Sequence, residues 1–190
     1  MSTTATLRSA VFPRATTYSK ALLVTFGTLF IAGLAQIAFP IPGSPVPITG
    51  QTLGVLLIGA SYGSQLGAAT LLTYLVAGVA GAPFFAQGAH GLAKLTGPTG
   101  GYLIGMLFAS LLVGALAGRK WDQKLRSALP AMLLGDVIIF TFGLYWLQAY
   151  THQSWTWTIA NGFTPFLLGE GLKIAIAGTS LPLVWKYVQR

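Results

Sequence analysis

Acidic side chains are the scarcest feature of this sequence, which has only three Asp and Glu residues and in which 7% of all residues are charged. An average soluble domain is about 25% charged, so a polar shell that faces water is excluded. Hydrophobic residues make up 54% of the chain, and its mean hydropathy is +0.70. A surface this poor in charge is stable only against lipid. We therefore predict an integral membrane protein that forms one compact bundle in the bilayer.

Cysteine is absent, which excludes disulfides, thiolate chemistry and cysteine metal sites. His90 and His152 are far apart in the sequence and have few acids nearby, so we predict neither a metal site nor a cofactor. The chain has no Walker loop, HExxH motif or Ser-His-Asp order, and we predict that it is not an enzyme. Its net charge is +8, but the basic residues form no patch with interleaved aromatics, so nucleic acid is not an expected partner.

Long hydrophobic runs are abundant. A membrane-crossing helix needs about 20 mostly apolar residues, and prolines and glycines divide the chain into segments of roughly this size. The polar "SYGSQ" at 61–65 splits one overlong run into two shorter helices. The sequence thus predicts an all-α, six-helix membrane bundle with spans at about 21–39, 49–62, 64–80, 102–117, 128–147 and 165–184.

The distribution of positive charge fixes the expected orientation. Six spans place both termini on one side, together with the 62–64 turn and the polar linker at 118–127. That side collects nine of the eleven Lys and Arg residues: Arg8, Arg14, Lys20, Arg119, Lys120, Lys124, Arg126, Lys186 and Arg190. Positive loops mark the cytoplasmic side. We predict a cytoplasmic tail at 1–19 and a membrane domain at 20–187, with both termini cytoplasmic in a bacterial plasma membrane.

One charged pair lies inside the last predicted span, in "PFLLGEGLKIAIAG". Glu170 and Lys173 are three residues apart and share a helix face. A charge in lipid costs about 2.5–3.5 kcal/mol even on the lenient insertion scales, so both side chains should face the bundle interior. The pair is either a staple between helices or part of a polar ligand pocket. Apolar packing would hold helices equally well, which favours the pocket.

Two stretches rich in proline and glycine, 40–50 and 82–101, lie on the side opposite the basic residues. Irregular backbone near a membrane is tolerated where it lines a cavity or is buried in protein, so we predict that these loops cover the mouth of a pocket. Apolar walls are expected from Phe84, Phe85 and Tyr102, and polar contacts from Gln51, Gln87, His90 and Lys94. Asp136 is expected to pair with the basic linker instead.

Small residues at Thr28, Ala32 and Ala35 occupy one face of the first span. Helices in membranes associate through such faces, because lipid tails are as apolar as leucine. This face either packs inside the bundle or docks another membrane subunit, and spacing alone leaves both possibilities open.

Three stretches resemble the BioY family, the substrate-binding S components of energy-coupling factor (ECF) transporters for biotin. They are "AQIAFPIPGSPVPITGQTLGVLLIGA", "YLVAGVAGAPFFAQGAHGLAKLTGPTGGYLIGM" and "PFLLGEGLKIAIAG". The resemblance implies biotin uptake by a six-helix bundle that binds biotin beneath the loops joining helices 1–2 and 3–4. It also implies a transmembrane T component and two cytoplasmic ATPases as partners.

Two positions differ from the pattern of the family. Its last helix usually reads P-G-D-x-x-K and supplies an Asp and a Lys to biotin. Here Lys173 matches, whereas Glu170 is one methylene longer than Asp. The AxxxA-type docking face of the first helix begins with Thr28 here, followed by Ala32.

Two other interpretations of the sequence remain open. One is an S component for another vitamin, and the other is a small intramembrane enzyme or structural subunit that uses Glu170 with His90 or Lys94.

Overall fold

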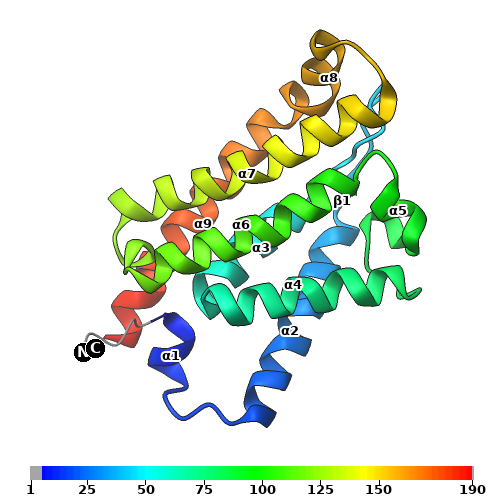
Figure 1. Ribbon diagram of the computed structural model, residues 1–190. Coiled ribbons are helices and arrows are strands. Elements are labelled where there is room, and N and C mark those ends of the chain that lie inside the picture. Colours follow the sequence, from blue (N-terminus) through cyan, green and yellow to red (C-terminus); the bar gives the residue numbers. More distant parts are fainter. Residues whose placement is uncertain (1–5, 190) are drawn as a thin grey trace.

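The computed structural model describes residues 6–189 and consists mostly of helices that form one bundle (Figure 1). The six predicted membrane helices are α2 (Thr17–Gln36), α3 (Gln51–Tyr62), α4 (Ser64–Val79), α6 (Gly100–Gly118), α7 (Leu125–Thr151) and α9 (Leu167–Val188). Thr17–Gln36, Gly100–Gly118, Leu125–Thr151 and the combined stretch Trp155–Val188 are each long and apolar enough to cross a membrane, whereas α3 and α4 are shorter apolar helices. The split of the overlong run is confirmed, since Gly63 turns the chain between α3 and α4 with a φ of 82°.

Helix α6 is the central element of the bundle. It is the most enclosed of the long helices: 67% of the residues in an 18-residue apolar stretch of α6 are buried, compared with 28% in α2. Glycines allow its neighbours to approach closely: a Cβ at Gly105 would meet the backbone of Ile139 on α7, and one at Gly114 would meet the backbone of Gly63 and Ser64. Close backbone approach of this kind is how helices associate in lipid.

One end of the bundle carries the irregular segments. They are the antiparallel strands β1 (Ala38–Phe39) and β2 (Ile48–Thr49), the turn η1 (Ala86–Gly88) and the short helices α5 (Leu92–Thr96) and α8 (Trp155–Gly162), followed by η3 (Thr164–Phe166). Figure 1 shows this end at the upper right. Helix α8 lies in a polar, aromatic segment between α7 and α9, and the side chain of Ser154 caps its N-terminus.

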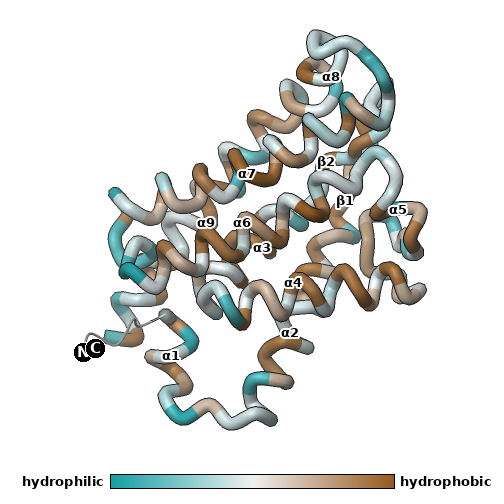
Figure 2. Tube along the Cα trace, in the orientation of Figure 1, coloured by the Kyte–Doolittle hydropathy of each residue, from teal (hydrophilic) through white to brown (hydrophobic). Residues whose placement is uncertain are grey.

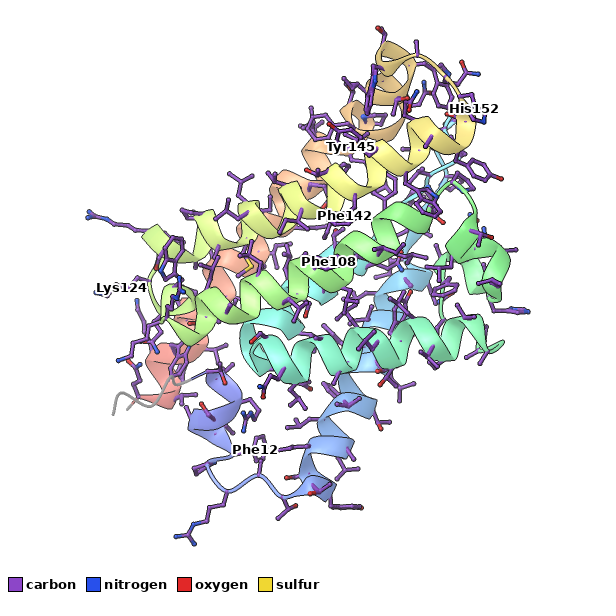
Figure 3. The ribbon with its side chains drawn as sticks, viewed as in Figure 1. Phe12, Phe108, Lys124, Phe142, Tyr145 and His152 are labelled. Atoms are coloured by element: carbon purple, nitrogen blue, oxygen red, sulfur yellow. The ribbon has the colours of Figure 1, made fainter. Side chains whose placement is uncertain are left out.

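The opposite end is formed by α1 (Leu7–Val11), η2 (Trp121–Gln123) and the C-terminal part of α9. In Figure 2 the hydrophobic residues follow the helices, and hydrophilic ones gather near the α6–α7 connection at this end. Figure 3 shows Lys124 and His152 at opposite ends of α7, and it shows Phe108 of α6 beside Phe142 of α7, whose ring centroids are 4.9 Å apart.

Asp122 anchors η2 to the last helix. Its carboxylate is buried, and Oδ2 accepts a hydrogen bond of 2.5 Å from Trp185 Nε1. Oδ1 has no hydrogen-bond partner among residues 6–189. Burial raises the pKa of Asp122 from its ordinary 3.8 to about 6, against the opposing effect of the Trp185 hydrogen bond.

This raised pKa predicts a pH-dependent stability. Between about pH 4 and pH 6 the native state binds more protons than the unfolded state, so the free energy of unfolding falls as the pH rises through this window. Asp122→Asn keeps an acceptor for Trp185 but cannot titrate. We expect the fall in the free energy of unfolding across this pH window to be about 1–3 kcal/mol smaller in this variant, at about 1.4 kcal/mol per pKa unit. Thermal unfolding in detergent at pH 4.5 and pH 7.5 checks this. An unchanged pH dependence in the variant would contradict it.

The small-residue face of the first span packs inside the bundle. Thr28, Ala32 and Ala35 are all buried, and Thr28 Oγ1 donates a hydrogen bond of 3.2 Å to the carbonyl of Thr70 on α4. In this structure the three residues are thus used for packing inside the bundle, and docking of another subunit through them stays a prediction. Their small size brings α2 close to α4, and the opposite face of α2 is the exposed one.

Candidate substrate-binding site

A cavity of about 220 Å³ lies beneath the irregular end of the bundle. The 40–49 segment covers it from one side and the 85–99 segment from another, while α3, α6, α7 and α9 supply its walls. Ligand pockets are commonly about 300–1,000 Å³, so this cavity suits a compact ligand. Its lining residues are Pro40, Ser44, Pro45, Val46, Pro47, Thr49, Gln51, Thr52, Phe85, Ala86, Gln87, Lys94, Thr99, Tyr102, Leu103, Met106, Ile139, Phe140, Phe166 and Glu170.

Glu170 is the buried charge of this cavity. It lies in the first turn of α9, where the free N–H groups of the helix favour a negative side chain. Its Oε1 accepts a 2.6 Å hydrogen bond from Lys173 Nζ, and its Oε2 accepts one of 2.8 Å from Thr52 Oγ1. Glu170 is only 5% exposed. This carboxylate is thus held in one orientation by partners from two helices.

Lys173 lies behind the cavity wall. Its Nζ donates to Glu170 Oε1, to Thr52 Oγ1 at 3.0 Å and to the carbonyl of Thr49 at 2.5 Å. An ammonium group has three donors, so the protein uses all of them. Lys173 therefore joins β2 and α3 to α9, and it presents the carboxylate of Glu170 rather than its own charge to the cavity.

Asp136 is a third charged group at this site. It is buried on α7, where it interacts electrostatically with Glu170 and Lys173, and its Oδ1 has no hydrogen-bond partner among residues 6–189. The expected pairing of Asp136 with the basic linker is therefore wrong, because the register of α7 places it against α9. Two carboxyl groups and one ammonium thus share a single buried cluster.

Gln51 organises the roof of the cavity. Its Oε1 accepts a hydrogen bond from Thr49 Oγ1 at 3.0 Å, and its Nε2 donates to Tyr74 Oη at 2.6 Å. Tyr74 in turn donates to the carbonyl of Phe84 at 3.1 Å. A chain of hydrogen bonds therefore connects β2, α3, α4 and the 82–91 segment. Gln51 lines the cavity, as expected, but its polar atoms also hold the covering segments in place.

The apolar walls are aromatic. Phe85 packs edge-on against Tyr74 with ring centroids 5.6 Å apart, and Tyr102 packs edge-on against Phe140 at 5.7 Å. The hydroxyl of Tyr102 donates a 2.8 Å hydrogen bond to the carbonyl of Gly162, which fixes the end of α8 over the bundle. Phe85 and Tyr102 both line the cavity; Phe84 packs beside it against Tyr74.

The covering segments are tied down by side chains that the sequence pattern did not single out. Ser44 Oγ donates to the carbonyl of Asn161 at 2.7 Å, which fixes the 40–49 segment to α8. Gln36 Oε1 accepts from the N–H of Gly88 at 2.8 Å, and Trp146 Nε1 donates to the carbonyl of Gly97 at 2.8 Å. Both irregular segments therefore have defined positions over the cavity.

The remaining predicted contacts separate into two groups. Gln87 and Lys94 line the cavity and are exposed, so they lie at its mouth. His90 is exposed and is absent from the lining, because its loop carries it away from the cavity. His90 was predicted to contact a ligand, but it does not line this cavity. Thr52 and Asp136, which complete the charged cluster, were not among the predicted site residues.

The wall formed by Phe85 gives a prediction. Gly78 of α4 lies against this ring so closely that a Cβ there would overlap it. We expect Gly78→Ala to displace Phe85 and to weaken the binding of a ligand in this cavity about tenfold, since overpacking costs about 1–3 kcal/mol and 1.4 kcal/mol is tenfold. Gly33→Ala is the control, because a Cβ there meets nothing within 4 Å. Titration of both variants checks this, and equal affinities would contradict it.

The fold and the cavity define a class of protein: a helical membrane protein with an internal cavity that contains a buried carboxylate. The chain belongs to the BioY family, whose model matches residues 4–190. The structure is similar to a solved chain titled "Crystal structure at 2.1 A of the S-component for biotin from an ECF-type ABC transporter", with a TM-score of 0.79 and 28% identity over 90% of this chain and 95% of that one.

Curated relatives support the same family. The biotin transporter BioY2 of Lactococcus lactis subsp. cremoris is 34% identical over 165 residues, which cover 84% of this chain and 87% of the relative. The biotin transporter BioY of Thermotoga maritima is 34% identical over 152 residues, with 80% and 86% covered. These are transporters, and the six-helix S-component fold is confirmed. Of the two residues considered as partners of Glu170 in an intramembrane enzyme, His90 lies outside the cavity lining and Lys94 lies within it, but the relatives are transporters.

Proposed function

We propose that this protein is a biotin-binding S component of an ECF transporter, and that its ligand is biotin held in the cavity above Glu170. The observation that carries the proposal is the fixed carboxylate of Glu170 in an otherwise largely apolar and aromatic cavity. Biotin joins a compact apolar bicycle to a ureido group with two N–H donors and a short chain that ends in a carboxylate. Each of these parts has a counterpart in the cavity.

The donors and acceptors of the cavity favour one orientation of biotin. A carboxylate is an acceptor only, so Glu170 suits the ureido N–H groups, whereas Lys173 has no donor left for a ligand carboxylate. Lys94, at the exposed mouth, is the cation that lines the cavity. We therefore place the ureido ring deep in the cavity and the carboxylate of the chain near Lys94.

A comparison of two ligands tests this orientation. We expect Lys94→Ala to weaken biotin binding by up to about fivefold, since an exposed ion pair contributes about 0.2–1 kcal/mol. Biotin amide lacks the terminal charge, so its affinity should be the same for Lys94→Ala and the unmodified protein. Titration calorimetry of both proteins with both ligands gives the four constants. An equal loss for biotin and its amide would contradict this orientation.

The proposal extends to the transporter complex. We propose that a T component and two ATPases drive biotin uptake in a bacterial plasma membrane, with both termini on the cytoplasmic side where the basic residues gather. Support comes from the likeness to a solved ECF-type S component. Uptake of labelled biotin by cells that produce this chain with and without those subunits tests the partnership, and equal ATP-dependent uptake in both would contradict it. A C-terminal reporter that is active only in cytoplasm tests the orientation.

A further inference from the structure

A second cavity lies at the opposite end of the bundle, far from the proposed biotin site. Its volume is about 540 Å³. It is open to the surface and is lined by α1, the start of α2, the turn between α3 and α4, and the C-terminal end of α6, which lie close together at the lower left of Figure 1. Thr6 at the start of α1 is buried there against Gly63 of the turn.

Three cationic side chains line this cavity: Arg8, Lys20 and Arg119. No acidic residue lines it, and the chain has only three acids in all. Asp122 bonds to Trp185, and Glu170 and Asp136 belong to the cluster around Lys173. Among residues 6–189, the Glu170–Lys173 pair is the one salt bridge. The described part of the chain therefore supplies no counter-charge to these three cations.

Two further features of the cavity favour an anion. The Nε of Arg8 is buried and has no hydrogen-bond partner within residues 6–189, and a buried unpaired donor is costly. Helix α4 also begins here at Ser64 without a side-chain cap, so its free N–H groups and the positive end of its dipole lie at the cavity wall. Such a helix end adds to the attraction for phosphate.

An apolar groove of about 250 Å³ adjoins the cavity. Tyr62 lines both, and Leu7 of the groove precedes Arg8 of the cavity in the chain. The groove runs between α2, α3 and α9, and its lining is Leu7, Phe26, Phe30, Leu57, Ile58, Ser61, Tyr62, Ser180, Leu181 and Val184. A basic cavity that continues into an apolar groove is complementary to a phospholipid, which has an anionic head group and hydrocarbon chains.

We propose that an anionic phospholipid binds at this end of the bundle, with its phosphate among Arg8, Lys20 and Arg119 and part of an acyl chain in the adjoining groove. Basic pockets between membrane helices are recognised sites for anionic head groups. The bound lipid would neutralise the three cations and hold α1 against α3 and α4. The proposal does not depend on which substrate occupies the other cavity.

The test uses the full-length protein, delipidated in detergent, with native mass spectrometry and thermal unfolding as readouts. The probes are phosphatidylglycerol, phosphatidylcholine with the same acyl chains, glycerol 3-phosphate and inorganic phosphate. We expect one phosphatidylglycerol to bind at least tenfold more tightly than each other probe, and to raise the unfolding midpoint as a ligand of the native state does. Equal binding of both lipids would overturn the anion site. Equal binding of inorganic phosphate would overturn the lipid as occupant.

Matched variants locate the site. Arg8→Gln/Arg119→Gln should weaken phosphatidylglycerol at least tenfold, since each basic residue near the head group contributes. Lys124→Gln/Arg126→Gln removes two exposed charges outside the cavity at the same end and should change binding less than twofold. Lys20→Gln, at an exposed position, should fold normally and weaken binding about threefold. Equal losses in the two double variants would overturn the proposal. Biotin affinity of all variants should be unchanged, which separates this site from the other.

Discussion

Lys173→Met is expected to weaken biotin binding about 30-fold or more. Lys173 Nζ connects Glu170, Thr52 and the Thr49 carbonyl, so its loss frees three parts of the cavity wall at once. It also leaves the carboxyl groups of Glu170 and Asp136 buried without a cation. Truncating one partner of a buried, hydrogen-bonded charge pair costs about 2–5 kcal/mol, and each 1.4 kcal/mol is tenfold in affinity.

The control for this variant lies on the same helix. Lys186 is exposed near the C-terminal end of α9, far from the cavity, so Lys186→Met removes the same charge and adds the same side chain without touching the cluster. Its biotin affinity should stay within twofold of the unmodified protein. Titration calorimetry in detergent measures both constants. A Lys173→Met protein that is folded and binds biotin with unchanged affinity would show that the cluster is only a staple between helices.

Glu170→Gln is expected to weaken biotin about tenfold to 100-fold. The substitution preserves the shape of the side chain but removes the charge that the ureido N–H groups are proposed to meet, and a hydrogen bond to a charged group is worth about 1.5–3 kcal/mol. The amide also places two donors where Thr52 and Lys173 already donate. One of the existing contacts with the carboxylate must therefore be lost.

Glu170→Asp is the matched comparison, because it keeps the charge and restores the carboxylate length usual in the family. We expect it to lose less than tenfold, since only the reach of the carboxylate changes. Biotin titrations of the Gln and Asp variants, both checked for a normal unfolding midpoint, separate charge from shape. If Asp weakened biotin as much as Gln did, the position of the carboxylate rather than its charge would determine affinity.

The six helices were predictable because hydrophobic length and the interruptions by proline and glycine are local properties of the sequence. The turn at Gly63 appeared as a short polar break within one apolar run, and the structure confirms it. Glu170 and Lys173 were also predictable, since a charge inside an apolar helix must face the protein. The two stretches rich in proline and glycine also indicated Gln51, Phe85 and Tyr102, which lie in or next to them, and all three line the cavity.

Other features depend on how distant helices meet, and no local pattern shows this. Asp136 lies beside Glu170 because of the register between α7 and α9, although it is 34 positions earlier in the chain. The small residues Thr28, Ala32 and Ala35 identified a close-packing face, but their spacing could not say that the partner is α4 of the same chain. Thr52 was missed because a threonine in an apolar helix usually bonds its own backbone.

The proposed site also explains why the chain keeps so costly a cluster in an apolar bundle. Lys173 neutralises and orients Glu170, Thr52 completes the support, and the covering segments are tied to α4 and α8 by separate hydrogen bonds. A site arranged in advance in this way loses little conformational freedom when a ligand enters, which favours high affinity.

Isothermal titration of the detergent-purified, ligand-free protein with biotin tests the central claim most directly. The account predicts saturable binding of one biotin per chain with a dissociation constant in the nanomolar to low micromolar range. Mass spectra of fresh preparations provide the check that the sample carries no biotin beforehand. No heat of binding from a folded, biotin-free sample would contradict the assignment of biotin and would leave the cavity above Glu170 to another ligand.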